Sequence, residues 1–271
     1  MKSEARPLDI RELSSHAEYQ ACVALQYETW GREFRDAVPA SVLHIAQRLG
    51  GVAAGAFDGD RLLGFVFGIT GVERDAIVHW SDMLAVRPEA RNHHIGRQLK
   101  EFQRAHCGRV GAQWIYWTYD PLVARNAHLN FNVFGVRVVE YVPDMYGQNT
   151  GSDLHRGIGT DRFIVAWDVD DHALAQRRRL IAAAREQSGF ADAPALGDPD
   201  HASDIPVGAP RLRIAVPADL PELLRQDATA AVRWRHATRA AFQGAMAAGF
   251  TVQGFRAGSA GGHGHYLLAR T

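Results

Sequence analysis

The stretch Ser81–Leu99 constrains the fold most, because its pattern changes from that of a strand to that of a helix within a few residues. Residues 77–86 are rich in β-branched, aromatic and apolar side chains, which predicts a strand, and Pro88 ends it because proline cannot donate to a strand ladder. From Ile95 the apolar residues recur at helical spacing. The sequence therefore predicts a strand, a short polar loop and a helix, with Gly96 at the start of the helix.

The start of such a helix suits an anion. Its first backbone N–H groups lack partners within the helix, and the helix dipole is positive there. A loop of this kind can hold a phosphate or pyrophosphate. Arg91 and Arg97 carry charges suited to the same anion. The alternative is that both arginines are ordinary surface charges.

The segment Val86-x-Pro88-Glu89-x-Arg91-x-x-x-Ile95-Gly96-x-x-Leu99 resembles the acetyl-CoA-binding segment of the GNAT superfamily of N-acetyltransferases. The loop of that family reads Gln/Arg-x-x-Gly-x-Gly/Ala. Arg91 and Gly96 match its first and last fixed positions, and His94 stands where the family has the middle glycine. This departure bears on the backbone of the loop, because a non-glycine residue at positive φ is strained.

The surrounding pattern predicts a series of strands and helices. Strands are expected at residues 8–13, 52–57, 61–69, 77–86, 113–119, 136–141 and 162–169, and helices at 15–30, 40–49, 95–106 and 123–134. The order β-α-α-β-β-β-α-β-α-β-β is the GNAT order, so the resemblance covers about residues 7–169. It implies an α/β fold in which a mixed, twisted sheet is flanked by helices.

The remaining residues predict an addition to this fold. A polar helix at 170–187 precedes a segment, 189–210, whose Ala, Gly, Pro and Asp content indicates a surface linker. An α+β tail follows, with strands at 212–216, 251–255 and 265–269 and helices at 219–225 and 227–248. The tail repeats the order in which the first region ends, either as a partial repeat or by coincidence. We expect domains at 1–169, 170–210 and 211–271, the last packed on the first or forming a contact in a homodimer.

Composition excludes several classes of protein. The 271 residues are 46% apolar and 22% charged with zero formal net charge, which disfavours a general binder of nucleic acid or anionic membranes. No apolar run is long enough to span a bilayer, and no signal peptide is visible.

Cys22 and Cys107 do not make a disulfide framework. The histidine pairs His93-His94 and His263-x-His265 lack further ligands at zinc-like spacing, so no metal is expected. The sequence predicts a cytoplasmic protein.

The resemblance implies a donor site for acetyl-CoA or another acyl-CoA. Backbone groups of Leu84 and Val86 would pair with the pantetheine arm. The pyrophosphate would be held by the loop residues Arg91, Asn92, His93, His94, Ile95, Gly96 and Arg97. Family members often place an asparagine on the CoA arm where Asn126 stands, although Asn126 could equally be bonded locally at its helix start.

Acyl transfer to an amine needs a base for the ammonium and an acid for the departing thiolate. In the family, amine and thioester react directly. Asp82, four residues before Val86, is the expected base, unless it is a buried aspartate paired with an arginine or the backbone. His79 is the next candidate, and strand alternation puts it on the opposite face. The position of the family's usual tyrosine acid is Phe131, so Tyr146, Tyr119 or water must substitute, and we favour Tyr146.

The predicted function is CoA-dependent transfer of an acetyl group, or another short acyl group such as succinyl, to a small-molecule amine such as an amino acid. Arg235 and Arg239 lie four apart on a helix and are expected to hold the carboxylate of the acceptor, the alternative being two solvated arginines. A non-catalytic acyl-CoA-binding or regulatory protein is the rival reading, which Phe131 and His94 favour. Acetylation of protein termini or lysines is disfavoured.

Overall fold

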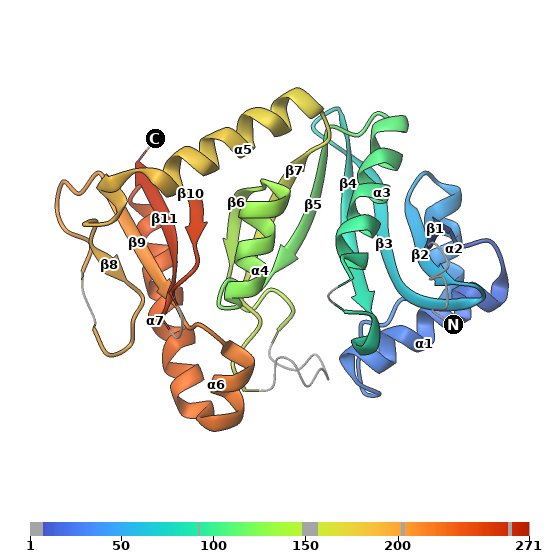
Figure 1. The fold of residues 1–271 in the computed structure, drawn as a ribbon, viewed down its shortest axis with the longest axis horizontal. Coiled ribbons are helices and arrows are strands. Elements are labelled where there is room, and N and C mark those ends of the chain that lie inside the picture. Colours follow the sequence, from blue (N-terminus) through green and yellow to red (C-terminus); the bar gives the residue numbers. More distant parts are fainter. Residues whose placement is uncertain (1–7, 92, 148–156, 202–203, 260–261, 271) are drawn as a thin grey trace, which may run out of the picture. The chain divides into compact units, whose positions relative to one another are not determined.

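The computed structural model describes residues 8–91, 93–147, 157–201, 204–259 and 262–270. They form two compact units (Figure 1). The first unit contains the described residues up to Trp117, and the second contains those from Thr118 onward.

The first unit contains one sheet whose strands lie in the order β1-β2-β3-β4-β5. All neighbours pair antiparallel except β4 and β5, which are parallel. The last two residues of β5 belong to the second unit. The elements are β1 (Asp9–Glu12), α1 (His16–Trp30), α2 (Ala40–Arg48), β2 (Val52–Asp58), β3 (Arg61–Glu73), β4 (Ala76–Val86), η1 (Pro88–Ala90), α3 (Ile95–Arg109) and β5 (Trp114–Tyr119).

Local sequence signals fix the ends of these elements. Ser15 and Glu18 form a capping box that begins α1, since each side chain accepts from the backbone N–H of the other. Pro39 precedes α2, and Gly59, at φ 57°, makes the turn between β2 and β3. The predicted helix starts and hairpin are therefore confirmed.

Helices cover both faces of the first unit's sheet. Neighbouring residues of a strand point to opposite faces, and in β3 these are Val66 and Phe67. Phe67 belongs to a buried cluster with residues of α1 and α2, including Leu25 and Leu43. Val66 belongs to a second cluster with residues of α3, including Leu99. The strand, loop and helix predicted around Ser81–Leu99 are thus fixed from two sides.

The second unit contains the antiparallel pair β6 and β7 and a four-stranded sheet in the order β10-β11-β9-β8. Its elements are α4 (Ala124–His128), the π-helical turn η2 (Leu129–Phe134), β6 (Arg137–Val142), β7 (Arg162–Asp168), α5 (Asp171–Glu186), η4 (Ser188–Phe190), β8 (Ala195–Leu196), β9 (Arg211–Val216), α6 (Leu220–Gln226), α7 (Ala228–Ala247), β10 (Phe250–Arg256) and β11 (Gly264–Arg270).

The C-terminal region shares its core with residues that precede it in the chain. Tyr266 of β11 packs its ring against Phe163 of β7 and Phe242 of α7. The next residue, Leu267, points to the other face and clusters with Ala184 of α5 and Phe190. Because this core joins 211–271 to residues of β7, the compact units divide at Trp117. The domain boundaries expected near residues 169 and 210 remain a prediction.

Two predicted segments differ in detail from the structure. The helix expected at 123–134 is a short α-helix that widens into the π-helical turn, and it ends at Gly135 in the left-handed conformation, as expected of a C-cap. The segment 189–210, expected to be a linker, adds strand β8 parallel to β9 and buries Phe190. Its alanines and leucine are enough to cover a sheet edge despite the abundant turn residues.

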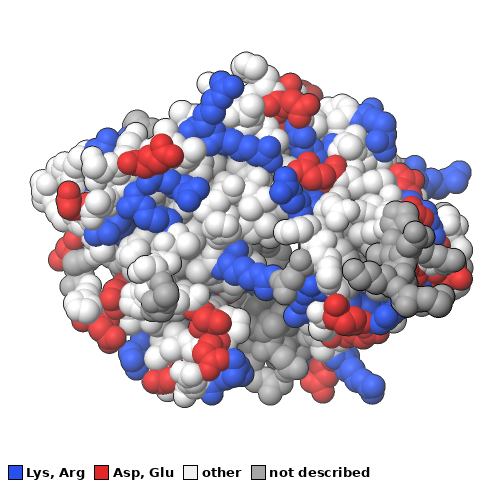
Figure 2. Space-filling view, in the orientation of Figure 1, with Lys and Arg blue, Asp and Glu red and all other residues white. Residues whose placement is uncertain are grey.

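The surface fits the neutral composition. Basic and acidic side chains are interspersed on the face in Figure 2 rather than gathered by sign. Among the described residues, no helix combines the length and apolarity needed to cross a membrane. Cys22 and Cys107 are both buried and unbonded.

Candidate active site

Strand β4 extends beyond its pairing with β5. The parallel register covers only Val78, His79 and Trp80 of β4. From Ser81 to Val86 the strand pairs with β3 alone among the described residues. The edge away from β3 therefore presents backbone N–H and C=O groups, and an extended ligand can pair with such an edge as an added strand.

A β-bulge in this edge sets the position of Asp82. Gly68 pairs with Ser81 and Phe67 pairs with Met83, so Asp82 is the extra residue. Ser81 and Met83 are buried, whereas Asp82 is exposed. Bulges redirect side chains and interrupt strict alternation, and the alternation used to separate His79 from Asp82 does not continue through this point.

The surroundings of Asp82 favour its protonated form. Neighbouring protein atoms partly desolvate the carboxylate, and Asp36 adds electrostatic repulsion. Both raise the pKa of Asp82 above its ordinary value, while a hydrogen bond from the Trp80 indole opposes them. A carboxylate with a raised pKa that is open to solvent is suited to accept a proton.

His79 has different surroundings. It is buried, with Nδ1 2.9 Å from Thr70 Oγ1 and Nε2 3.0 Å from Gln103 Nε2. Burial, with Lys100 and His106 nearby, lowers the pKa of His79 to about 3. The imidazole is neutral near pH 7 and both nitrogens have neighbours, which suits a structural position better than that of a base.

Lys100 is a buried cation that the sequence analysis did not identify. Its Nζ donates to Ser81 Oγ at 2.8 Å and to Gln103 Oε1 at 3.2 Å, and lies 3.7 Å from the centre of the Trp117 ring. Burial lowers the pKa of Lys100 to about 7. The signal lay in the spacing of Lys100, Gln103 and Cys107, which forms a second buried stripe on α3.

The loop between β4 and α3 is open at the helix start. His94 adopts the left-handed conformation at φ 59°, so a non-glycine residue does occupy positive φ at the position where strain was expected. No side chain caps α3 and no acidic residue lies in its first turn. Arg91 and Arg97 are exposed, and the Nε of Arg91 donates to the Val86 carbonyl at 3.4 Å.

The other loop residues of the expected donor site differ in exposure. His93 is exposed like His94, whereas Ile95 is buried in the cluster with Leu99. Asn92 lies outside the described residues. Gly96 is half-buried, and a Cβ built there would meet Leu84 Cδ2 at 3.5 Å, an ordinary contact. The chain itself therefore has room for a side chain at Gly96.

Asn126 of α4 and Tyr146, which follows β6 in the chain, are two candidate residues of the second unit. The backbone N–H of Asn126 donates to the Val123 carbonyl, and no hydrogen bond of its side chain is found within the described residues. Tyr146 is exposed, and its hydroxyl lies 2.9 Å from Thr118 Oγ1 at the end of β5. Its ring faces the guanidinium of Arg162 at 5.4 Å.

The other aromatic residues considered for the thiolate acid are buried. Phe131 packs edge-on against Tyr266. Tyr119 shares a hydrogen bond of 3.2 Å with the Tyr266 hydroxyl, and burial raises the pKa of Tyr119 strongly. Tyr146 is the exposed hydroxyl among these residues.

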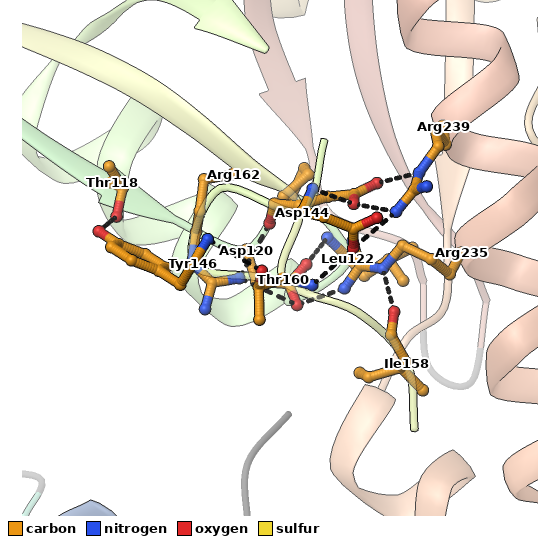
Figure 3. A network of polar contacts seen from close by, with 12 residues as sticks. Thr118, Asp120, Leu122, Asp144, Tyr146, Ile158, Thr160, Arg162, Arg235 and Arg239 are labelled. Carbon is orange, nitrogen blue, oxygen red and sulfur yellow. Dashed lines mark hydrogen bonds and ion pairs between the residues drawn. The ribbon is translucent and has the colours of Figure 1, made fainter. Parts of the chain in front are cut away.

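Arg235 and Arg239 are paired with carboxylates of the chain itself (Figure 3). Arg235 is 2% exposed and binds Asp120 at 2.5 Å through Nη2. Arg239 binds Asp161 through Nε and Nη2 and contacts Asp144 at 3.0 Å. Neither residue is a freely solvated arginine. The carboxylates hold both guanidinium groups in place, and their role in acceptor binding remains a prediction.

Within the described residues, no group of three or more His, Cys, Asp or Glu side chains is arranged to hold a metal ion.

Comparison with known proteins gives matches in structure alone. No family model matches the chain. No curated protein matches its sequence. Solved acetyltransferase structures align at low sequence identity.

Three of them illustrate the range. A putative acetyltransferase from Salmonella typhimurium, solved with acetyl-CoA, is 16% identical with a TM-score of 0.47, over 61% of this chain and 96% of the other. The ribosomal-protein-S18-alanine N-acetyltransferase from Escherichia coli is 16% identical with a TM-score of 0.46, over 60% of this chain and 94% of the other. An aminoglycoside 6'-acetyltransferase type Ii is 20% identical with a TM-score of 0.47, over 60% of this chain and 97% of the other.

The fold is assigned from the order of the helices and strands along the chain. From β1 to β7 the helices and strands follow the order β-α-α-β-β-β-α-β-α-β-β predicted from the sequence. The chain therefore has a GNAT-like mixed α/β fold with an additional C-terminal α+β region.

Proposed function

We propose that the chain is a CoA-dependent N-acyltransferase of the GNAT type. It transfers an acetyl group from acetyl-CoA, or another short acyl group such as succinyl, to a small-molecule amine. The observation that carries this proposal is the open edge of β4 from Ser81 to Val86 beside the uncapped start of α3. An extended arm and a pyrophosphate are the two parts of CoA that such a strand and helix can bind.

The acyl-CoA donor is held by backbone hydrogen bonds and by positively charged side chains. The pantetheine arm pairs with the backbone at Leu84 and Val86, while Arg91, Arg97 and the first N–H groups of α3 hold the pyrophosphate. The imidazoles of His93 and His94 line the same loop, and Asn126 contacts the CoA arm through its side-chain amide. A backbone N–H at the β4 edge polarises the thioester carbonyl.

The reaction is a direct transfer. Asp82 removes a proton from the acceptor ammonium, directly or through one water, and the neutral amine attacks the thioester carbonyl carbon. The C–S bond then breaks, the attacking nitrogen releases its second proton to water to form the amide, and the CoA thiolate takes a proton from a donor that water reprotonates. We assign this proton to Tyr146, because its hydroxyl is exposed whereas Phe131 has no proton to give. Asp82 is preferred to His79 as the base because His79 is buried and its pKa, lowered to about 3, makes it a weak proton acceptor.

A release assay for free thiol tests the proposal. The protein is mixed with acetyl-CoA or succinyl-CoA and a panel of amines that includes free amino acids. We expect thiol release that depends on the amine. Tight acyl-CoA binding with no release for any amine would favour the rival function, a non-catalytic acyl-CoA-binding protein, which Phe131 and His94 support.

A further inference from the structure

Lys100 joins β4 and β5 at the point where their backbone pairing ends, within the first unit. The parallel register advances one residue at a time and ends with Trp80 opposite Tyr116. Ser81 and Trp117 are the next residues of the two strands. The Lys100 ammonium contacts both of their side chains, at 2.8 Å from Ser81 Oγ and 3.7 Å from the centre of the Trp117 ring. The strands are therefore joined here through a side chain of α3 instead of through their backbones.

The free edge of β4 begins at this contact. From Ser81 to Val86 the strand pairs with β3 alone among the described residues. If the backbones of β4 and β5 continued to pair, β5 would occupy the edge that an extended ligand needs. The bulge begins at the same place, because Asp82 is the extra residue between Ser81 and Met83. Lys100 thus fixes the side chain of the residue from which both features start.

A chain of buried hydrogen bonds sets the position of the ammonium. Thr70 donates to the Gly50 carbonyl at 2.7 Å, so its hydroxyl oxygen accepts from Nδ1 of the neutral His79. Nε2 of His79 then accepts from the amide nitrogen of Gln103 at 3.0 Å. This orientation turns Gln103 Oε1 toward Lys100, which donates to it at 3.2 Å. His79 therefore helps to place Lys100.

The ammonium at this position lowers the stability of the fold. It has three partners, Ser81 Oγ, Gln103 Oε1 and the face of the Trp117 ring, and no carboxylate among the described residues. Removing an ammonium from water without a counter-ion disfavours its charged form. A methionine is unbranched and would fill much of the same space without a charge. A cation of this kind beside a free strand edge points to a role beyond packing.

We propose that Lys100 is a positioning residue for the acyl-CoA donor. It holds Ser81 and Trp117 by their side chains, so that the backbone of β4 from Ser81 onward stays free to pair with the pantetheine arm. The inference rests on the proposed function, because acyl-CoA is the ligand assigned to that edge. Lys100 acts through Ser81 and does not touch the ligand, in keeping with its buried side chain.

The first test is calorimetric titration of CoA into wild type, Lys100→Met, Ser81→Ala and the double variant. Lys100→Met removes the charge and the hydrogen bonds, and Ser81→Ala removes the acceptor. Each single variant should bind CoA about tenfold more weakly, as expected when a hydrogen bond to a charged group is lost. The double variant should bind like the single variants, because both remove the same contact. Losses that add in the double variant would contradict a role exerted through Ser81.

Cys107→Ala is the matched control. Cys107 is fully buried on the same stripe of α3, about two turns farther along the helix. Alanine there loosens the packing of α3 and leaves the hydrogen bond between Lys100 and Ser81 intact. We expect a lower melting temperature with wild-type CoA affinity. A loss of CoA affinity equal to that of Lys100→Met would show that loosening of α3 is the cause, and would overturn the proposal.

The signal of Lys100 itself gives a second readout. The chain contains two lysines, Lys2 and Lys100, so isotope-labelled lysine gives two side-chain signals in an NMR spectrum. Comparison with Lys100→Met identifies the signal of Lys100. We expect this signal to shift when CoA saturates wild type, because the ligand pairs with the strand that Lys100 holds. An unchanged Lys100 signal in saturated protein would contradict the coupling.

Turnover and binding separate this inference from the proposed function. In Lys100→Met the KM for acyl-CoA should rise about tenfold while the KM for the amine stays constant. Wild-type CoA affinity in both Lys100→Met and Ser81→Ala would remove the positioning role and leave the proposed function. No CoA binding by wild type would remove the proposed function and this role with it.

Discussion

Lys100 donates a hydrogen bond to the hydroxyl of Ser81, at 2.8 Å, in the interior of the first unit. Both side chains are buried, and Lys100 has no carboxylate partner among the described residues. The pair joins α3 to β4 beside Asp82, the bulge residue. The protonation of Lys100 is therefore coupled to the stability of the elements that carry the proposed active site.

Stability should depend on pH through Lys100. Burial lowers its pKa to about 7, against 10.5 for an exposed lysine, so between these values the unfolded chain binds more protons than the folded one. The free energy of unfolding contributed by this group therefore rises as pH increases from 7 to 10.5 and is constant below pH 7. Urea unfolding of wild type and Lys100→Met measures it, because their difference cancels the other titrating groups. A difference that does not change with pH would contradict this prediction.

Gly68 should be required for packing around His79. A Cβ at Gly68 would overlap His79 Nε2 and come within 2.9 Å of Gln103 Nε2, in a buried part of β3. Overpacking of this kind costs about 1–3 kcal/mol. Gly68→Ala should therefore lower the free energy of unfolding by that amount. Gly71→Ala is the matched control, since nothing lies within 4 Å of its Cβ position, and it should be nearly neutral. Equal stability of the two variants would contradict this prediction, because it would show that the neighbours of Gly68 move to make room for the methyl group.

Asp82→Asn separates a catalytic base from a residue that only attracts the amine. The substitution keeps the shape and removes the charge and basicity. If Asp82 is the base, kcat should fall by about 10² to 10⁴-fold and acyl-CoA binding should survive. A rise of KM at constant kcat would instead indicate attraction of the amine alone. In wild type, kcat should increase with pH through a pKa above 3.8, because burial and Asp36 raise the pKa of Asp82.

The C-terminal region should be needed for folding of the second unit. Tyr266 is fully buried, packs on Phe163, and donates to the Pro121 carbonyl at 2.8 Å. Tyr266→Ala should cost about 3–5 kcal/mol, as for other large aromatic residues replaced by alanine. A chain truncated after Asp170 should aggregate, because it exposes this core. A soluble, fully active truncated protein would show that the region is a separate appendage.

Sequence patterns predicted those parts of the fold that local chemistry decides. The capping box at Ser15, the hairpin at Gly59 and the end of the π-helical turn at Gly135 depend on residues close in the chain. The bulge at Asp82 could not be predicted, because it arises from a mismatch in the pairing of β4 with β3. A prediction from alternation fails where such a mismatch occurs.

The hydrogen bonds and ion pairs of buried charged residues also could not be predicted from the sequence. Lys100 was not identified because a charged residue is normally expected on the solvent-facing side of a helix, whereas Lys100 lies in a buried stripe of α3. There it contacts Ser81, Gln103 and Trp117. Arg235 was named from the sequence as a residue of the acceptor site, which stays a prediction, and its pairing with Asp120 joins residues far apart in the chain. Such long-range pairs follow from packing rather than from spacing.

Calorimetric titration of CoA into wild type and Gly96→Ala tests the central claim most directly. Within the chain a Cβ at Gly96 makes only ordinary contacts, and alanine has a higher helix propensity than glycine. Gly96→Ala should thus be at least as stable as wild type yet bind CoA more weakly, and Gly96→Trp should lose binding, because the pyrophosphate approaches this backbone. Wild-type CoA affinity in folded Gly96→Trp, or no CoA binding by wild type, would contradict the account.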